Sequence, residues 1–200
     1  MAATPREPVS RMEYSPEDYF RPIPIAELFP NPGPLEVDLG CGDGTFLIAM
    51  AQKHPEKNFI GIERLFGRVR NTSRKAERAA LTNLRLLRVE STYAITHLLA
   101  PGTVGSFYLM FPDPWPKRRH WPRRLVQPAF LDAAAVALIG GGDLCIKTDD
   151  ANYFTFIEKV AASCEQFISH PWTEEMPCTD FERHYVAQGR RIQSLRLVKR

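Results

Sequence analysis

Three alternating prolines hold an acid and an indole directly before a cluster of basic side chains. The segment is Phe-Pro-Asp-Pro-Trp-Pro-Lys-Arg-Arg-His, residues 111–120, and it follows an apolar run at 106–110 that predicts a buried strand. Proline fixes φ and biases the residue before it toward extended backbone, so we expect a stiff frame for Asp113 and Trp115. A rigid carboxylate beside an aromatic ring and several cations suits a polyanionic substrate that carries a planar base. The alternative is a proline-rich turn before a solvated basic loop.

A glycine-rich turn is the second candidate site. Gly-x-Gly-x-Gly at residues 40–44 joins a predicted buried strand at 35–39 to an apolar-faced helix at 45–54. Glycines leave room for a ligand to approach the backbone closely. Glu63 follows at the end of the next predicted strand, 58–62, where a carboxylate can accept hydrogen bonds from a ribose diol. This order of elements predicts a site for a nucleoside cofactor.

The charges around the turn indicate which cofactor it binds. A dinucleotide-binding turn carries Gly-x-Gly-x-x-Gly, and here the third glycine comes one residue early. Glu36, Asp38 and Asp43 crowd the turn and would repel a pyrophosphate. S-adenosylmethionine has no phosphate and carries two cationic groups, so we predict this cofactor, bound against Gly40 and Gly42. A turn without a ligand and a nicotinamide site are the alternatives.

The order of the predicted elements brings the two sites together. The predicted strands are 35–39, 58–62, 84–89, 106–111 and 143–148. The predicted helices lie between or after them, at 45–54, 66–81, 92–99, 126–139 and 150–164. A terminal pair of strands is predicted at 167–172 and 193–198, joined by a long loop at 173–191. This alternation predicts an α/β fold, a single Rossmann-like, doubly wound, mostly parallel sheet. Ligands bind such sheets beyond the carboxyl ends of strands, where the strand order reverses. We therefore expect the glycine turn and the 111–120 loop to face one crevice, in a domain over 22–200 that follows a flexible arm at 1–21.

Basic residues gather in two places, although the net charge is only +3. The first group lies within and just after the 111–120 loop, and we expect four of its members to contact RNA phosphates: Arg118, Arg119, Arg123 and Arg124. The second group lies on or just before the predicted helix at 66–81, where a solvated helix face explains it.

Other classes of protein fit the composition less well. The four cysteines have no metal-ligand spacing, so we expect no metal and reduced thiols. The first residues lack the apolar core of a signal peptide, and no apolar run is long enough to span a membrane. We expect a cytoplasmic protein without a membrane partner. Its oligomeric state, monomer or homodimer, stays open.

Together these motifs resemble the tRNA (guanine-N7)-methyltransferases. The resemblance covers most of residues 33–200 and rests on Glu-Val-Asp-Leu-Gly-Cys-Gly-Asp-Gly, Gly-Ile-Glu, the 111–120 block and Thr-Asp-Phe-Glu at 179–182. It implies a class I methyltransferase that transfers a methyl group from S-adenosylmethionine to a guanine N7 in the variable loop of tRNA. The implied cofactor contacts are Glu36, Glu63, Glu90 and Asp113, and the implied substrate contacts are Lys117, Asp149, Thr179, Asp180, Phe181 and Glu182. At Glu90 the family usually has aspartate.

The expected reaction is a direct displacement in which N7 attacks the sulfonium methyl group. Guanine N7 has a free lone pair, so no proton must leave first, and catalysis rests on alignment and on a carboxylate facing the moving charge. We assign that catalytic role to Asp113. Two alternatives remain: methylation of an exocyclic base amine, and a non-catalytic RNA-binding protein that retains the fold.

Overall fold

The computed structural model describes residues 10–172 and 174–200. The strands are β1 (Glu13–Tyr14), β2 (Leu35–Leu39), β3 (Asn58–Ile62), β4 (Leu84–Leu87), β5 (Val104–Met110), β6 (Leu138–Thr148), β7 (Phe167–His170) and β8 (Gln193–Lys199). The helices are α1 (Ile25–Leu28), α2 (Thr45–Lys53), α3 (Phe66–Arg78), α4 (Ser91–Tyr93), α5 (Pro128–Ala137), α6 (Ala151–Ala162) and α7 (Asp180–Ala187), with a π-helix η1 (Ala94–Leu98) and a 3-10 helix η2 (Arg118–Arg123).

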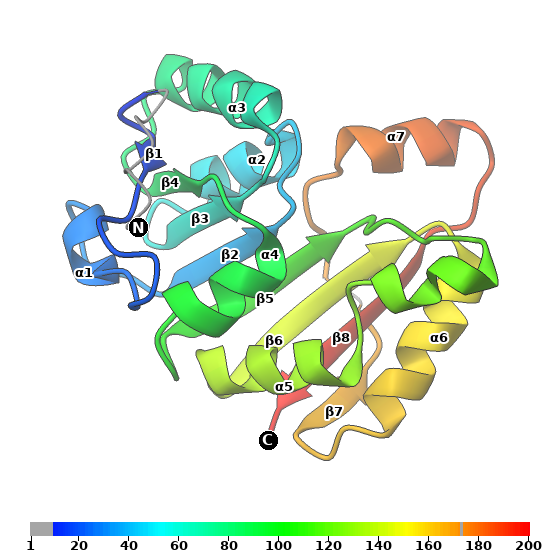
Figure 1. The fold of residues 1–200 in the computed structure, drawn as a ribbon. Coiled ribbons are helices and arrows are strands. Elements are labelled where there is room, and N and C mark those ends of the chain that lie inside the picture. The colour runs from blue at the N-terminus through cyan, green and yellow to red at the C-terminus, as the bar shows by residue number, and fades with distance from the viewer. Residues whose placement is uncertain (1–9, 173) are drawn as a thin grey trace.

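One sheet of eight strands forms the centre of the molecule, in the order β1-β4-β3-β2-β5-β6-β8-β7 (Figure 1). The strands from β1 to β6 pair in parallel, and β8 pairs antiparallel with both β6 and β7. The predicted doubly wound, mostly parallel α/β sheet is confirmed. The strand order reverses between β2 and β5, so the predicted crevice is expected at the carboxyl ends of these two strands.

Side chains alternate between the two faces of the sheet and build two cores. Leu35, Val37 and Leu39 of β2 pack on the face that α5, α6 and η1 cover. The other face packs against α2 and α3, through residues such as Phe46 and Val69. Helices therefore cover both faces (Figure 1), as the alternation of elements predicts.

Three segments differ from the sequence-based expectation. Part of the predicted flexible arm forms β1, which extends the sheet beside β4 with Met12 buried. The predicted helix at 92–99 is a short α-helix that continues as a π-helix. The predicted loop at 173–191 contains the helix α7, which stands near the arrow tips of β5 and β6 in Figure 1. Within the described residues, no helix combines the length and the apolar character that crossing a membrane requires.

Candidate active site

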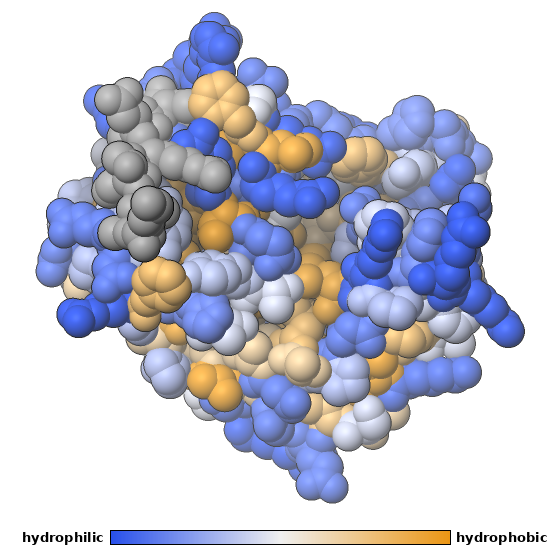
Figure 2. Space-filling model, viewed as in Figure 1, coloured by the Kyte–Doolittle hydropathy of each residue, from blue (hydrophilic) through white to orange (hydrophobic). Residues whose placement is uncertain are grey.

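A cavity of about 360 Å³ lies at the carboxyl ends of β2, β3, β4 and β5. Its size falls in the range typical of small-molecule sites. Figure 2 shows this region of the surface as a hollow with apolar side chains inside and hydrophilic ones around it. A wider hollow of about 630 Å³ lies between α6 and β7 and contains none of the predicted site residues. The position of the first cavity, where the strand order reverses, makes it the candidate active site.

Four predicted cofactor residues line this cavity: Gly40, Glu63, Glu90 and Asp113. Gly40 has φ +76°, and a Cβ built on it would meet no atom within 4 Å, so the turn leaves open space for a ligand. Glu63 Oε1 accepts a hydrogen bond from the Leu65 backbone N–H at 2.9 Å, and Oε2 lies 3.6 Å from Arg68. The lining residues fit a cofactor with a ribose and an extended polar chain.

Glu90 also has a structural role at the end of β4. Its Oε2 accepts a hydrogen bond from the Tyr93 backbone N–H at 2.9 Å and so caps α4. Glutamate is an uncommon helix cap, because its side chain is one methylene longer than that of aspartate. The residue nevertheless lines the cavity, so both functions can coexist through its two oxygens.

Two other predicted cofactor residues do not line the cavity. Glu36 is the second residue of β2, and its buried carboxylate accepts hydrogen bonds from Lys57 Nζ at 2.5 Å and Tyr108 Oη at 2.8 Å. The predicted cofactor contact at Glu36 is therefore not carried into the proposal below. Gly42 has φ +58° and anchors the turn to α3, because its carbonyl accepts a hydrogen bond from Thr72 Oγ1 at 3.2 Å.

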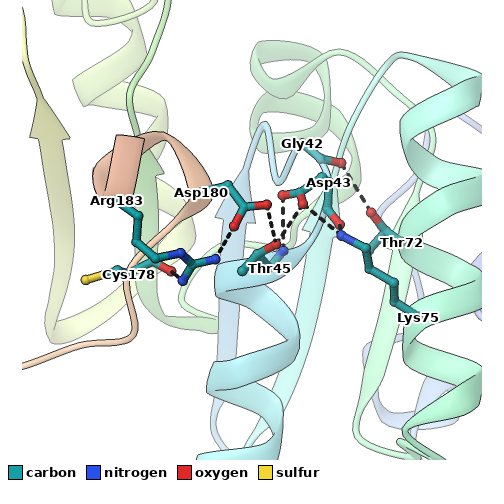
Figure 3. A network of polar contacts seen from close by, with 8 residues as sticks. All are labelled: Gly42, Asp43, Thr45, Thr72, Lys75, Cys178, Asp180 and Arg183. Atoms are coloured by element: carbon teal, nitrogen blue, oxygen red, sulfur yellow. Dashed lines mark hydrogen bonds and ion pairs between the residues drawn. The ribbon is translucent and has the colours of Figure 1, made fainter. Parts of the chain in front are cut away.

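The glycine turn is tied to helices on both sides (Figure 3). Asp43 accepts hydrogen bonds from Thr45 Oγ1 at 2.7 Å and from Lys75 Nζ at 2.8 Å, and Thr45 Oγ1 lies 3.2 Å from Asp180 Oδ2 on α7. Partial burial raises the pKa of Asp43, but the hydrogen bonds from Lys75 and Thr45 outweigh it and hold the pKa well below its usual value. Asp43 is thus ionised, and the ammonium of Lys75 on α3 compensates its charge.

Asp38 is the acid of the turn region that has no cationic partner among the described residues. It is 2% exposed, and its Oδ1 is buried and accepts no hydrogen bond from any of them. Burial first, and then the charges of Glu63 and Asp43, raise the pKa of Asp38 to about 8. A carboxyl group in such a position favours a cation nearby.

Replacing Asp38 should change how stability depends on pH. An acid with a raised folded-state pKa releases its proton less readily than in the unfolded chain, so it makes the free energy of unfolding fall as pH rises from about 4 to about 8. We expect Asp38→Asn to remove this fall, and to stabilise the protein more at pH 8 than at pH 5. Urea unfolding at both pH values measures the difference. An equal effect of the substitution at both would contradict the raised pKa.

The loop after β5 carries Asp113 on a strained backbone. Phe111 and Trp115 have φ of +55° and +44°, which bulky residues rarely adopt. The proline after Trp115 predicts extended backbone there, but the structure has a positive φ instead. In this conformation the indole lies 5.0 Å from the Arg123 guanidinium and 5.7 Å from the His120 ring, measured between centres. Such strain is typical of functional loops. Asp113 is exposed and, in the described part of the chain, forms no hydrogen bond or ion pair through its carboxylate.

Of the four predicted phosphate contacts, Arg118, Arg119 and Arg123 are exposed, whereas Arg124 is 2% exposed. The Arg124 guanidinium lies over the ring of Trp121 at 4.5 Å, and the rings of Tyr153 and Phe156 are the other two aromatic contacts. Its Nε donates to the Pro114 carbonyl at 2.8 Å. The prediction of a phosphate contact is wrong for Arg124, because the side chain is buried and holds the Asp113 loop instead.

Removing this guanidinium should weaken the fold. Arg124→Met loses the hydrogen bonds to the Pro114 carbonyl and to Asn152 Oδ1, and leaves the Pro114 carbonyl without its partner. We expect the free energy of unfolding to fall by about 2–4 kcal/mol, measured by urea denaturation. Arg119→Met, in the same loop but exposed, is the matched control and should change stability by less than about 0.5 kcal/mol. Equal stabilities of the two variants would refute the role of Arg124.

The predicted substrate residues are brought together by α7, except for Lys117. Thr179 caps α7, since its Oγ1 accepts a hydrogen bond from the Glu182 N–H at 2.9 Å, and Asp180 approaches the glycine turn. Phe181 is half exposed. Asp149 follows β6 and accepts a hydrogen bond from Arg190 at 2.6 Å, just beyond α7. Lys117 is exposed before η2, and no contact places it beside α7 in the described structure.

Sequence reasoning missed two features of this region. The helix α7 was expected to be part of a loop, although Thr-x-x-Glu at 179–182 is the pattern of a helix start. Glu182 is buried and pairs with Lys147 Nζ of β6 at 2.7 Å, a contact between residues too far apart in the sequence to be inferred from spacing.

Comparisons with known proteins agree with this geometry. A family model described as putative methyltransferase matches residues 32–195. The tRNA (guanine-N(7)-)-methyltransferase of Halorhodospira halophila is 34% identical over 86% of this chain and 78% of its own length. The enzyme of the same name from Syntrophotalea carbinolica is 34% identical over 88% of this chain and 78% of its own length.

Solved structures share the fold at lower sequence identity. The 16S rRNA methyltransferase KamB has a TM-score of 0.63 at 16% identity, with 88% of this chain and 91% of that chain covered. A SAM-dependent methyltransferase from Aquifex aeolicus has a TM-score of 0.60 at 12% identity, with 88% and 87% covered. The fold is thus that of the class I methyltransferases. Given the match to the family model and to relatives along most of their length, this chain belongs to the tRNA (guanine-N(7)-)-methyltransferase family.

Proposed function

We propose that this protein transfers the methyl group of S-adenosylmethionine to N7 of a guanine in the variable loop of tRNA. The observation that carries the proposal is one cavity lined by both the glycine turn, at Gly40, and the proline-framed loop, at Asp113. Relatives named for this reaction support the choice of substrate. Action on tRNA would place the protein in the cytoplasm.

The cofactor would occupy the cavity with its adenosine toward the ends of β3 and β4. When bound, S-adenosylmethionine supplies an electrophilic methyl group on a sulfonium. Gly40 lets the cofactor lie against the backbone, Glu63 accepts from the ribose hydroxyls, and Glu90 lies where the adenine would be held. The unpaired acid Asp38, just below the turn, favours binding of a cationic ligand.

Glu63 should contribute strongly to cofactor affinity. In Glu63→Gln the side chain can still accept a hydrogen bond from Leu65 N–H, but it loses the negative charge that a pair of hydroxyl donors favours. We expect calorimetry to show weaker S-adenosylmethionine binding by about 1–3 kcal/mol, with tRNA affinity unchanged. Glu158→Gln, exposed on α6, serves as the control. Unaltered cofactor affinity would exclude the ribose role.

The tRNA would approach the face that carries the Asp113 loop and α7. Asp113 lines the cavity, and its carboxylate is free of protein partners among the described residues, so it can accept from the guanine edge and face the developing positive charge. The exposed Arg118, Arg119 and Arg123 are placed in the same loop and would contact phosphates, with Lys117 beside them. Asp149 and residues 179–182 would hold the nucleotide from the opposite side.

A methyl-transfer assay tests this function. Unmodified tRNA is incubated with S-adenosylmethionine labelled in the methyl group, and nuclease digestion then identifies the labelled nucleotide. We expect the label in 7-methylguanosine, at one position of the variable loop. Label on an exocyclic nitrogen would favour an amine methyltransferase instead. Cofactor binding without transfer to any tRNA would favour a non-catalytic RNA-binding protein.

A further inference from the structure

Helix α3 holds the protein's excess of positive charge. Its 13 residues include five arginine or lysine side chains and one acid, Glu77, which gives the helix a net +4. The whole chain has a net +3, so the residues outside α3 carry a formal −1. Three of the arginines follow one another at intervals of four residues and so lie in one row along the helix. This row, the arginine stripe, consists of Arg70, Arg74 and Arg78.

The arginine stripe faces solvent. The buried residues of α3 pack toward the sheet, and they are Val69, Thr72, Ser73 and Ala76. With 3.6 residues per turn, the stripe lies on the other side of the helix from these residues. All three arginines are exposed, and none forms an ion pair or a hydrogen bond through its guanidinium with residues 10–172 or 174–200. Other cations of the helix do have partners, because Lys75 pairs with Asp43 and Arg68 with Glu63.

The stripe weakens the helix that carries it. Like charges four residues apart destabilise a helix, and Arg70 with Arg74, and Arg74 with Arg78, form two such pairs. Acids at the same spacing would compensate them, but Glu77 forms no ion pair with the stripe in the described part of the chain. Stability of the fold therefore gives no reason for these three arginines. A polyanion bound along the stripe would remove the repulsion between them.

Helix α3 begins at the rim of the candidate active site. Arg64, Leu65 and Arg68, at or just before its first turn, line the cavity. From there the helix extends for about 20 Å, at the upper edge of the molecule in Figure 1. Figure 3 shows the glycine turn between Lys75 of α3 and Asp180 of α7. An RNA that places one base in the cavity therefore has α3 within its reach.

We propose that the arginine stripe is a second tRNA-binding surface, which contacts phosphates in a part of the tRNA remote from the target guanine. This inference rests on the proposed function, since tRNA is the polyanion that the cavity would bring to α3. Successive arginines of the stripe rise by about 6 Å along the helix axis, so they can follow neighbouring phosphates of one RNA strand. Phosphate contacts carry no sequence information, so the stripe would add affinity for any tRNA.

A membrane surface fits the stripe less well than RNA does. Helices that bind membranes insert an apolar face between the lipids. Beyond Phe66 at its start, the apolar side chains of α3 are buried in the core of the protein. The exposed face therefore offers charge alone, which matches a row of phosphates on a nucleic acid.

The experiment compares the unmodified protein with a triple variant that carries Arg70→Gln, Arg74→Gln and Arg78→Gln. Glutamine is a good helix former, so α3 is retained. At about 0.15 M salt we expect the triple variant to bind tRNA about 10- to 100-fold more weakly. The slope of log Kd against log salt concentration should fall by roughly 0.7–0.9 for each lost contact. In methyl transfer, the loss should appear in KM for tRNA, with kcat within about twofold.

Further variants test whether charge and position are responsible. Lysine at the same three positions keeps the charge and should retain the tRNA affinity and the salt slope. Arg74→Gln alone should weaken binding about two- to fivefold, whereas Lys159→Gln, exposed on α6 at the other face of the sheet, should leave it unchanged. The melting temperature of the triple variant should not fall, because two repulsive pairs are removed. If the triple variant fails to fold, the lysine variant and Arg74→Gln still test the proposal.

Footprinting of the tRNA with hydroxyl radicals locates the contact. The unmodified protein should protect two segments, and the triple variant only the segment around the target guanosine. Equal tRNA affinities and salt slopes of the two proteins would overturn the inference. A triple variant that loses binding to phosphatidylserine vesicles but keeps its tRNA affinity would also overturn it, in favour of a membrane surface. Absence of methyl transfer by the unmodified protein would instead refute the proposed function.

Discussion

A tRNA with 7-deazaguanine at the target position should bind this protein and accept no methyl group. The analogue keeps the shape of the base, its Watson–Crick edge and every phosphate, and replaces the N7 lone pair with a C–H group. Under the proposed function, binding would rest on the exposed arginines Arg118, Arg119 and Arg123 and on base contacts that the analogue retains. Transfer requires the lone pair, so we expect the methylation rate to fall below detection while the tRNA affinity stays the same.

The measurement is incorporation of labelled methyl groups into two otherwise identical tRNAs, together with their affinities from filter binding. An enzyme that attacks an exocyclic amine would methylate both tRNAs, because its acceptor is untouched. Robust methylation of the deaza nucleotide would remove the N7 assignment. It would leave the assignment to the methyltransferase family intact.

Asp113→Asn should lower kcat about 10²- to 10³-fold, which is the size of effect found when one preorganised electrostatic contact is lost from a transition state. The asparagine keeps the size of the side chain and removes the charge that faces the cation developing on the purine. Because N7 needs no deprotonation, the pH profile should lack a general-base limb both before and after the substitution. Single-turnover rates across pH measure both effects.

The matched control for Asp113 is Asp132→Asn, an exposed acid on α5. It should change neither kcat nor the pH profile. A rate for Asp113→Asn within a few fold of the unmodified protein would contradict the catalytic role. Asp113 also lines the cavity. The affinity of the Asp113→Asn variant for S-adenosylmethionine is therefore measured in parallel, so that a loss of cofactor binding is separated from a loss of rate.

The positions of Glu63 and of the Asp113 loop could be predicted, because each follows an apolar run that predicts a strand. In a parallel sheet the ends of such strands meet at one edge, so the order of elements was sufficient to place both around one cavity. Glu90, which lines the same cavity, was expected there only from the family resemblance. Glu36 shows the limit of this reasoning. It lies inside its strand rather than after it, and its charge is compensated by Lys57, a contact that spacing does not reveal.

The acidic residues around the glycine turn support the cofactor prediction less strongly than the sequence suggested. Glu36 pairs with Lys57 and Asp43 with Lys75, so Asp38 is the one of these three acids that has no cationic partner in the described structure. The cofactor prediction agrees with the family and the fold. The electrostatic reason for it, however, rests on one residue instead of three.

Arg124 shows why a run of basic residues cannot be interpreted from composition. Arg118, Arg119 and Arg123 are exposed, whereas Arg124 turns inward to an aromatic environment supplied partly by α6. Those rings come from a distant part of the chain, and the same holds for Lys147, whose partner lies on α7. Contacts between distant elements decide the roles of both residues.

The position of β8 has a consequence for how the protein is made. This strand lies between β6 and β7, although both precede it in the chain. During synthesis β6 can pair with β5, but its other edge and the whole of β7 have no partner strand until residues 193–199 have left the ribosome. Exposed strand edges are sites of aggregation. Because α7 comes directly before β8, the helix that carries the predicted substrate residues 180–182 reaches its place in the fold only at the end of synthesis.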